Sequence, residues 1–409
     1  MVFGKKKQPP TGTVVPVLSE PPKQARTKAS YRRSTPPATA ITAEVSVLLP
    51  QACACGGSFD QDAITSHDRY VEDIPLPELT PGYQAKLVTR YVVQRGICLA
   101  CGKTTSGQDL GGAQVALGPN VRLLVAHLIA VAGMSYAQAA HLILTLYGLV
   151  ITDGEIANIL QKQHRNWLPA YGQLRADIRA APVRRYDETP WAIQDQGNAG
   201  YAWVMSAANS PNTLFHCATS RGAPHAKRLH GKDSSAVHIS DDYQAYRTLQ
   251  GNQQLCWVHL YRAIRDLRYN ANLPKEQLAY VTQWYEQFAA IYQDLRLYLD
   301  EPFELVVRET QAQELWQRVR LLAQEQRPRA GEPDKLRKLK AQLLRAGKDR
   351  LLVCLSKDTP CDNNRAERDL RQLVLKRKRS FGSKTQRGAQ ALATVLSLCT
   401  TTWRSNPKI

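Results

Sequence analysis

The sequence predicts an α/β fold, preceded by a cysteine-rich region and a helical region and interrupted by a helical insertion. Three β-type runs separated by turn residues follow one another between residues 181 and 218, which indicates an antiparallel meander. Further β-type runs then alternate with helical stretches, as in an α/β layout. Amphipathic helical stretches fill 271–359, which predicts the insertion before the last helices of the core.

Length and charge limit the kinds of protein that this chain can be. Its 409 residues, 43% of them apolar, suffice for two or three domains that each bury a core. Lys and Arg number 54 against 35 Asp and Glu, and the net charge of +19 implies a polyanionic partner. The longest apolar stretch, 123–134, is too short to span a membrane, and no signal peptide is evident. We therefore expect a cytoplasmic, nucleoid-associated protein that binds nucleic acid.

Residues 1–45 carry seven prolines and eight Lys or Arg, with few large apolar residues. Such a segment buries too little surface to offset the entropy of ordering, so it is interpreted as a disordered basic arm. It either adds nonspecific affinity for phosphates or serves only to keep the chain soluble.

The region 46–108 is rich in cysteine, glycine and β-forming residues, and it contains two close cysteine pairs. Cys53 and Cys55 form the first pair, Cys98 and Cys101 the second, and a glycine follows each pair. Four thiolates close a tetrahedral Zn²⁺ site, so this region is predicted to be a zinc ribbon with a structural zinc ion. Two unrelated pairs of buried thiols are the alternative.

Residues 109–180 have apolar residues at helical spacing, broken twice by glycine-containing turns. Ser135 and either Thr152 or Asp153 stand where helix N-caps belong. Short helices joined in this way are similar to a helix-turn-helix, and a plain helical linker is the alternative.

Three acidic residues stand out in the predicted core, whose parts are 181–270 and 360–409. Asp187 lies in the middle of the first β-type run, where a buried charge is costly unless it is neutralised. Asp241 ends the fourth run. Glu367 lies near the start of a helix, with apolar residues at i+3 and i+7, which turns it toward the sheet. Three inward carboxylates can hold two Mg²⁺ or Mn²⁺ ions about 3.5–4 Å apart for phosphoryl transfer.

Each carboxylate also has a simpler interpretation. Asp241 and Asp242 can be a helix N-cap pair. Asp187 can pair with one of the two arginines just before it, and Glu367 can belong to a solvated mixed-charge face.

The sequences around these carboxylates resemble, in order, the signature blocks of transposases of the insertion sequence sixty-six family. The blocks are Asp187-Glu188-Thr189-Pro190, Ser240-Asp241-Asp242-Tyr243-Gln244-Ala245-Tyr246, Cys256-Trp257-Val258-His259 and Asp362-Asn363-Asn364-Arg365-Ala366-Glu367-Arg368. The resemblance covers about residues 50 to 400, and the last block is the most specific. It implies an RNase H-like catalytic core whose DDE triad is Asp187, Asp241 and Glu367. Asp242 stands where the family usually has glycine, and Tyr243 keeps the register on Asp241.

The third block of the resemblance maps onto Cys256 and His259. His259 is expected near the carboxylates, where it can hydrogen-bond a phosphate or orient a ligand; a structural histidine is the alternative. Two ligands alone do not make a zinc site.

The last 49 residues are strongly basic, with eleven Lys and Arg against three acids between Cys361 and Ile409. Side chains that follow the Glu367 helix are expected to grip DNA near the scissile phosphate; a solvated helix end is the alternative. The residues expected to bind DNA are Lys376, Arg377, Lys378, Arg379, Lys384 and Arg387.

The resemblance implies a Mg²⁺-dependent transposase that cleaves terminal inverted repeats and joins them to target DNA. It also implies a homo-oligomer that synapses two DNA ends, and accessory proteins from the same element. Two other functions fit some of the same features: an RNase H-fold, structure-selective DNA nuclease, and a catalytically inactive zinc-containing DNA-binding protein.

Overall fold

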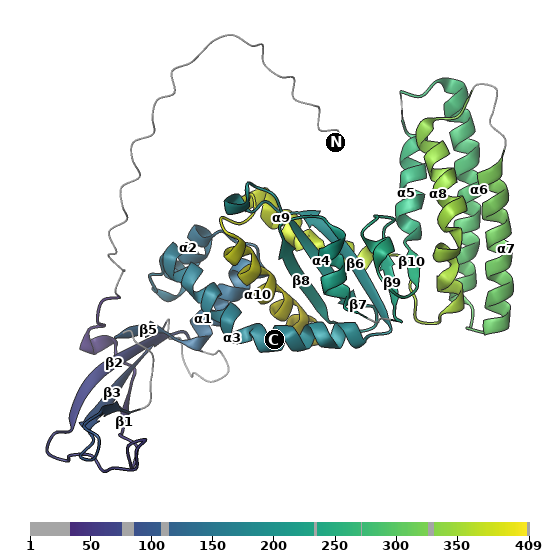
Figure 1. Ribbon diagram of the computed structural model, residues 1–409. Coiled ribbons are helices and arrows are strands. Elements are labelled where there is room, and N and C mark those ends of the chain that lie inside the picture. Colours follow the sequence, from purple (N-terminus) through teal and green to yellow (C-terminus); the bar gives the residue numbers. More distant parts are fainter. Residues whose placement is uncertain are drawn as a thin grey trace, which may run out of the picture. The chain divides into compact units, whose positions relative to one another are not determined.

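The computed structural model describes residues 33–75, 86–107, 114–232, 235–270, 272–325 and 331–406 (Figure 1). The chain divides into two compact units, residues 1–71 with 88–116 and residues 72–87 with 117–409, and each is described by itself. The predicted mixed α/β class is confirmed. Within the described ranges, no helix combines the length and the apolar character needed to cross a bilayer.

The first unit is built on a five-stranded sheet. Its strands are β1 (Ala43–Val47), β2 (Thr65–Asp73), β3 (Leu87–Ile97), β4 (Thr104–Ser106) and β5 (Val115–Leu117). They lie in the order β1-β3-β2-β5, with β4 paired to β3. Most of the expected disordered arm, residues 1–32, lies outside the described residues. Its end differs from the expectation, because Thr42 exchanges hydrogen bonds with the backbone of Val88 and leads into β1, which pairs with β3 in parallel.

Three helices follow β5, as the apolar spacing predicted. They are α1 (Pro119–Ala130), α2 (Tyr136–Tyr147) and α3 (Asp153–Ala180). Ser135 caps α2 and Thr152 caps α3, each in a capping box with the residue three positions later, so both predicted caps are confirmed. The turn between them begins at Gly148, whose positive φ of 61° ends α2.

The centre of the second unit is a five-stranded sheet. Its strands are β6 (Val183–Pro190), β7 (Tyr201–Ala207), β8 (Thr213–Ala218), β9 (Val237–Ser240) and β10 (Gln253–Leu255). The first three form the predicted antiparallel meander. The chain then crosses over through α4 (Ala223–His230), so that β9 lies parallel to β6 and β10 parallel to β9. The resulting order is β10-β9-β6-β7-β8.

Helices cover both faces of this sheet. Successive residues of each strand point to opposite faces, so each strand contributes side chains to both helical layers. Trp203 and Met205 of β7 join the core that includes residues of α4. Val204, between them, joins the core formed with α9 (Asn364–Ser380) and α10 (Gln386–Ser405). Residues of β6 alternate in the same way, so a charged residue on this strand faces either the α4 side or the α9 side, according to its position along the strand.

Between β10 and α9, the predicted insertion at 271–359 forms a helical bundle together with α5 (Trp257–Arg268), a helix that the prediction assigned to the first part of the core (Figure 1). The other helices of the bundle are α6 (Lys275–Asp300), α7 (Leu305–Gln324) and α8 (Asp334–Leu351). Trp257 and Trp284 each stack on Phe288 inside it, so core packing accounts for both tryptophans. The bundle is tied to the sheet by the buried Gln254, whose side chain donates to the carbonyl of Arg350 and accepts from the N–H of Val353.

A pair of buried histidines should make the second unit sensitive to acid. His230 and His238 are almost fully buried, their ring centres are 5.6 Å apart, and burial lowers the pKa of each to about 4. In the unfolded chain the pKa of each histidine is about 6.5, so the unfolded chain binds more protons than the folded one between pH 6.5 and 4. The free energy of unfolding therefore decreases as the pH is lowered through that window. Each histidine is expected to remove about 2 kcal/mol between pH 7 and pH 5. Urea unfolding of the wild type and of His238→Gln at both pH values measures this. Equal losses in the two proteins would contradict it.

Candidate functional site

The parallel pairing of β6 and β9 brings the chain segments that carry Asp187 and Asp241 next to each other. Val183 pairs with Val237, an offset of 54 residues, and the same offset relates 187 to 241, one residue beyond the end of β9. The paired residues end at Arg185 with Ile239, where neighbouring strands lie about 4.8 Å apart, and each aspartate follows this last pair by two residues. Asp187 and Asp241, more than fifty residues apart in sequence, thus lie in neighbouring segments of the fold, and the charge of Asp241 raises the pKa of Asp187.

Asp187 faces the α9 side of the sheet. Tyr186, the residue before it, packs into the core on the α4 side, and side chains alternate along a strand. The alternative that an arginine neutralises Asp187 is wrong in the described structure. Arg184 donates to the carbonyls of Ala181 and His230, and Arg185 to that of Ala208.

Helix α9 presents Glu367 to this side because Asn363, just before the helix, is fixed to the sheet. The Asn363 side chain is fully buried, and its Nδ2 donates to the carbonyl of Tyr186 at 2.7 Å. Its N–H meets the sulfur of Cys256 at 3.2 Å, which also fixes the start of α5. Asn363 and Cys256 therefore position the helix, and in the described structure Cys256 acts through packing and hydrogen bonding.

Glu367 lies at the edge of the buried face of α9, with its side chain 25% exposed. The apolar spacing predicted a more inward position. Its Oε2 accepts from Arg262 at 2.9 Å, and its Oε1 lies 3.5 Å from His259 Nε2. Oε1 is buried and accepts no hydrogen bond in the described structure. The predicted approach of His259 to a carboxylate is thus found, and one glutamate oxygen is left as a buried acceptor that suits a cation.

The charges of the three carboxylates act on one another. Burial raises the pKa of Asp187 well above its usual value, and the charges of Glu188, Asp241 and Glu367 raise it further, against an opposing backbone hydrogen bond. The three are nevertheless not gathered around one point. In the described part of the chain, the single group of three or more ligand side chains within 4.8 Å of one another is a cysteine cluster. The carboxylates would suit a pair of ions, which spans a wider site than one ion does.

The two adjacent aspartates have different surroundings. Asp242 is enclosed by cationic and amide donors: Arg247 and Arg345 pair with its carboxylate, and Gln342 donates to it. Asp241 makes one local contact, in which its Oδ1 accepts from the N–H of Tyr243 at 3.0 Å. The helix nearest along the chain is a 3-10 turn at Tyr246–Thr248 preceded by Ala245, so neither aspartate is its N-cap.

Glu188 is a buried carboxylate that was named above only as a member of a signature block, without a role of its own. Its side chain is 2% exposed, and its partners are Arg221 and the hydroxyl of Tyr246. Burial raises the pKa of Glu188, and the charge of Asp241 adds to the effect, while the bonds to Tyr246 and Arg221 oppose it. Glu188 points to the opposite face of β6 from Asp187, so it is a neighbour of the carboxylate pair on the α4 side.

The basic residues expected to bind DNA divide into inward and outward groups. Lys376 is buried, and its ammonium donates to the carbonyls of Ile129 and Met134. Burial lowers its pKa to about 8, and Arg379 adds to this. Lys376 therefore closes the C-terminal end of α1 and is not presented to a phosphate.

Arg377 donates to the hydroxyl of Thr189 and to the carbonyl of Pro190, at the end of β6. Arg387 is exposed and donates to the side chain of Gln161 on α3. The remaining three residues of the predicted group, all exposed, are Lys378, Arg379 and Lys384.

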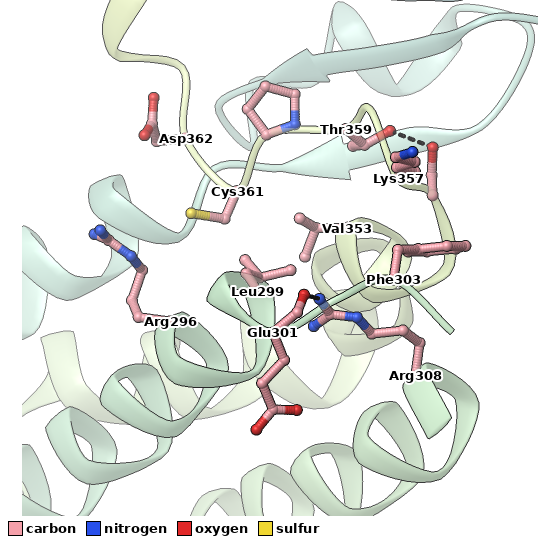
Figure 2. Close-up of a pocket in the computed structure, with 12 residues that line it drawn as sticks. Arg296, Leu299, Glu301, Phe303, Arg308, Val353, Lys357, Thr359, Cys361 and Asp362 are labelled. Atoms are coloured by element: carbon pink, nitrogen blue, oxygen red, sulfur yellow. Dashed lines mark hydrogen bonds between the residues drawn. The ribbon is translucent and has the colours of Figure 1, made fainter. Parts of the chain in front are cut away.

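A cavity of about 460 Å³ lies beside the chain that leads from the bundle into α9 (Figure 2). Figure 2 shows Arg296, Cys361 and Asp362 on one side of it and Phe303 and Arg308 on the other. Arg308 donates to the carbonyl of Glu301 at 2.8 Å. None of the three predicted metal-binding carboxylates lines this cavity, so the cavity and the candidate active site are different places.

The four cysteines of the first unit converge as predicted. Their sulfur atoms all lie within 4.8 Å of one another, with 3.8 Å between Cys53 and Cys101 and 3.6 Å between Cys55 and Cys98. Four sulfurs bound tetrahedrally to Zn²⁺ at about 2.3 Å would be about 3.8 Å apart. A glycine with positive φ follows each pair, Gly56 at 86° and Gly102 at 66°, and lets the backbone turn tightly around the thiols.

Backbone N–H groups favour the thiolate at two of these cysteines. The N–H of Cys55 lowers the pKa of Cys53 to about 6, against the effect of burial, and the N–H of Cys101 lowers that of Cys98. Thiolates are the form that binds zinc. The cluster fits a structural zinc site. The alternative interpretation, two unrelated pairs of buried thiols, does not account for the four sulfur atoms lying together.

Comparison with known proteins identifies the second unit. The family model described as Transposase IS66 family matches residues 118–391, which include β6, β9, α9 and the inserted bundle. No curated protein matches the chain. The matched residues are well over half of the 409 in the sequence. The resemblance found in the signature blocks is confirmed, and the chain belongs to the IS66 family of transposases.

Proposed function

We propose that this protein is a DDE transposase that uses Asp187, Asp241 and Glu367 to hold two Mg²⁺ or Mn²⁺ ions. The observation that supports the proposal is the parallel pairing of β6 with β9, whose register, if continued by two residues, would bring Asp187 level with Asp241. Glu367 faces them from α9, and its buried Oε1 accepts no hydrogen bond in the described structure. Both observations fit a site whose remaining ligand is a cation.

The strand order supports an RNase H-like core. The first strand of the antiparallel meander, β6, pairs on its other side with β9 in parallel, and β10 follows β9 in parallel, with helices on both faces; the family resemblance implies such an arrangement. The proposed core comprises 181–270 and 360–409, with 271–359 as the insertion. The zinc ribbon at 46–108 and the α2–α3 pair within 109–180 would each bind DNA.

Divalent ions at the carboxylates would lower the pKa of a bound water and neutralise charge developing at phosphorus. The protein's own part is to position groups. Asp187 and Asp241 fix one edge of the site through the sheet, while Asn363 sets the place of Glu367. His259, 3.5 Å from Glu367, can orient that carboxylate or hydrogen-bond a phosphate oxygen.

Two displacements at phosphorus follow from this assignment. In the first, a water oxygen bonds to phosphorus as the bond from phosphorus to the 3′-oxygen breaks, which leaves a 3′-hydroxyl and a 5′-phosphate. In the second, that 3′-hydroxyl attacks a phosphate of the target, and the target's 3′-oxygen leaves. The outward basic residues around α9 would hold the strands by their phosphates. They are Arg377, Lys378, Arg379, Lys384 and Arg387.

The substrates and partners are proposed from family membership. The DNA is expected to be the terminal inverted repeats of an insertion sequence together with a target duplex. Synapsis of two ends implies a homo-oligomer, and accessory proteins of the same element are expected.

Cleavage of a plasmid that carries the element's two ends tests the function. With Mg²⁺ the wild-type protein is expected to nick at the outer edges of the repeats and leave 3′-hydroxyls, and EDTA should stop the reaction. A plasmid with scrambled ends, and one with a four-way junction in place of the ends, are the matched controls. Cutting of the junction without regard to the ends would indicate a structure-selective nuclease, and end binding without cutting would indicate an inactive DNA-binding protein.

A further inference from the structure

Arg221 is an exposed arginine that the protein holds in one position. It lies in the loop between β8 and α4, and its side chain is 43% exposed. Its Nε donates to Glu188 Oε1 at 2.7 Å, and its Nη2 pairs with the same oxygen. The guanidinium carbon lies 3.8 Å from the centre of the Tyr243 ring, and the Tyr243 hydroxyl donates to the carbonyl of Arg221 at 2.8 Å. Contacts on two sides therefore fix an arginine that would otherwise move freely in water.

Both residues that hold Arg221 are next to proposed metal ligands. Glu188 follows Asp187 in β6, and the N–H of Tyr243 donates to the Asp241 carboxylate at 3.0 Å. Arg221 is thus tied to β6, which carries Asp187, and to the segment after β9, which carries Asp241. It comes from a loop that contributes no carboxylate to the site.

The arginine still has hydrogen-bonding capacity. A guanidinium has five N–H bonds, and the contacts to Glu188 use those at Nε and Nη2. No other acceptor for its side chain is found among the residues that the structure describes, and the exposed fraction leaves the rest of the group open to solvent. A planar, immobilised group with spare donors matches the paired oxygens of a phosphate.

We propose that Arg221 binds a phosphate of the DNA strand being cut, at or directly beside the scissile position. The proposal rests on the proposed function and adds a phosphate-binding site to it. Glu188 and Tyr243 act as positioning residues for this site, because they touch Arg221 and have no need to touch DNA. Arg221 keeps its proton throughout, so its part is electrostatic and geometric.

A thermodynamic cycle between Arg221 and single DNA phosphates tests the contact. DNA ends are made with one neutral methylphosphonate at the scissile position or at one of the two positions on either side. Binding is measured by fluorescence anisotropy with Ca²⁺ in place of Mg²⁺, so that affinity is read without cleavage. Arg221→Met is compared with the wild type, and Arg228→Met, an exposed arginine on α4, is the matched control.

At one position, neutralising the phosphate should weaken wild-type binding about 10-fold, as expected for a charged hydrogen-bonded pair. Arg221→Met should show about the same loss on unmodified DNA and no further loss at that position, whereas Arg228→Met should be additive with it. Glu188→Gln, which loosens the arginine without removing it, should give an intermediate coupling. Additive losses for Arg221→Met at all five positions would overturn the proposal.

The outcome is separable from that of the proposed function. Coupling at one phosphate in a protein that never cuts DNA would keep the phosphate site and remove the transposase chemistry. Metal-dependent cutting with additive losses everywhere would do the reverse. Thermal unfolding of Arg221→Met shows whether the variant is folded, and Arg221→Lys, which retains the charge but not the planar fork, supplies a second folded variant expected to recover part of the coupling.

Discussion

Replacing Asp187 with asparagine is expected to abolish metal-dependent strand cleavage while raising the stability of the metal-free protein. An isosteric amide cannot contribute a charge to a divalent ion, and the loss of several kcal/mol of metal stabilisation lowers the rate by at least about 10³-fold. The stability gain has a separate cause. Burial and the nearby charges raise the pKa of Asp187, so its ionised form is disfavoured in the folded state and costs stability above that pKa. Relief of about 1 kcal/mol would raise the melting temperature by about 2–4 °C.

The control for this variant is a carboxylate outside the site. Asp266 on α5 is exposed and pairs with Arg265, so Asp266→Asn should leave both cleavage and melting temperature nearly unchanged. Cleavage is followed in single turnover, and melting by calorimetry in EDTA. If Asp187→Asn cuts DNA at the wild-type rate, Asp187 is not a metal ligand. A loss of cleavage accompanied by a lower melting temperature would indicate a structural role.

Asp241 and Asp242 allow a comparison of cleavage between variants of two adjacent residues. Asp241→Asn should lose cleavage as Asp187→Asn does, because the Asp241 carboxylate is close enough for its charge to raise the pKa of Asp187. Asp242→Asn should keep cleavage within about 10-fold, since its oxygens are already occupied by Arg247, Arg345 and Gln342. The reverse ranking would move the metal ligand to Asp242.

Much of this site follows from local sequence. Strand periodicity and turn residues predicted the meander, and β-type runs located Asp187 within a strand and Asp241 at the end of one. Ser135 and Thr152 were recognisable as caps because a capping box lies within four residues of chain. The cysteine pairs were recognisable for the same reason, since short spacing and a following glycine restrict what each pair can do.

Other features of the site depend on contacts that no local pattern contains. Asp242 contacts Gln342 and Arg345, about a hundred residues later in the chain. Arg221 binds Glu188, and two strands, β7 and β8, lie between these two residues in the sequence. Their pairing requires the whole sheet and the inserted bundle to be in place. The burial of Lys376 is different, because it could have been predicted from the sequence. Position 376 continues the buried stripe of Ala366, Leu370 and Leu373 on α9, and this helical spacing outweighs membership in a basic run.

Removing two thiols from the cysteine cluster is expected to release zinc and unfold the first unit while leaving the second intact. The first unit has a small hydrophobic core at this end, formed by Phe59 with Cys53 and Cys98, so the metal must supply much of its stability. Structural zinc binding is worth about 10–16 kcal/mol in comparable small modules, well above the stability of such a unit without metal. The Cys53→Ser, Cys98→Ser double variant should therefore lose its zinc and its hydrogen-exchange protection in β1 and β3.

The second unit has its own cores on both faces of its sheet, so its melting transition should persist in the double variant. Cys399→Ser, a half-buried cysteine of α10 outside the cluster, is the matched control and should retain zinc. Metal content per chain by mass spectrometry and exchange in residues 43–107 are the two readouts. Because the thiols already lie at the sulfur spacing of a tetrahedral zinc site, the wild type should bind one zinc ion per chain. A double variant that keeps its zinc would place the metal elsewhere and leave the cluster a group of ordinary thiols.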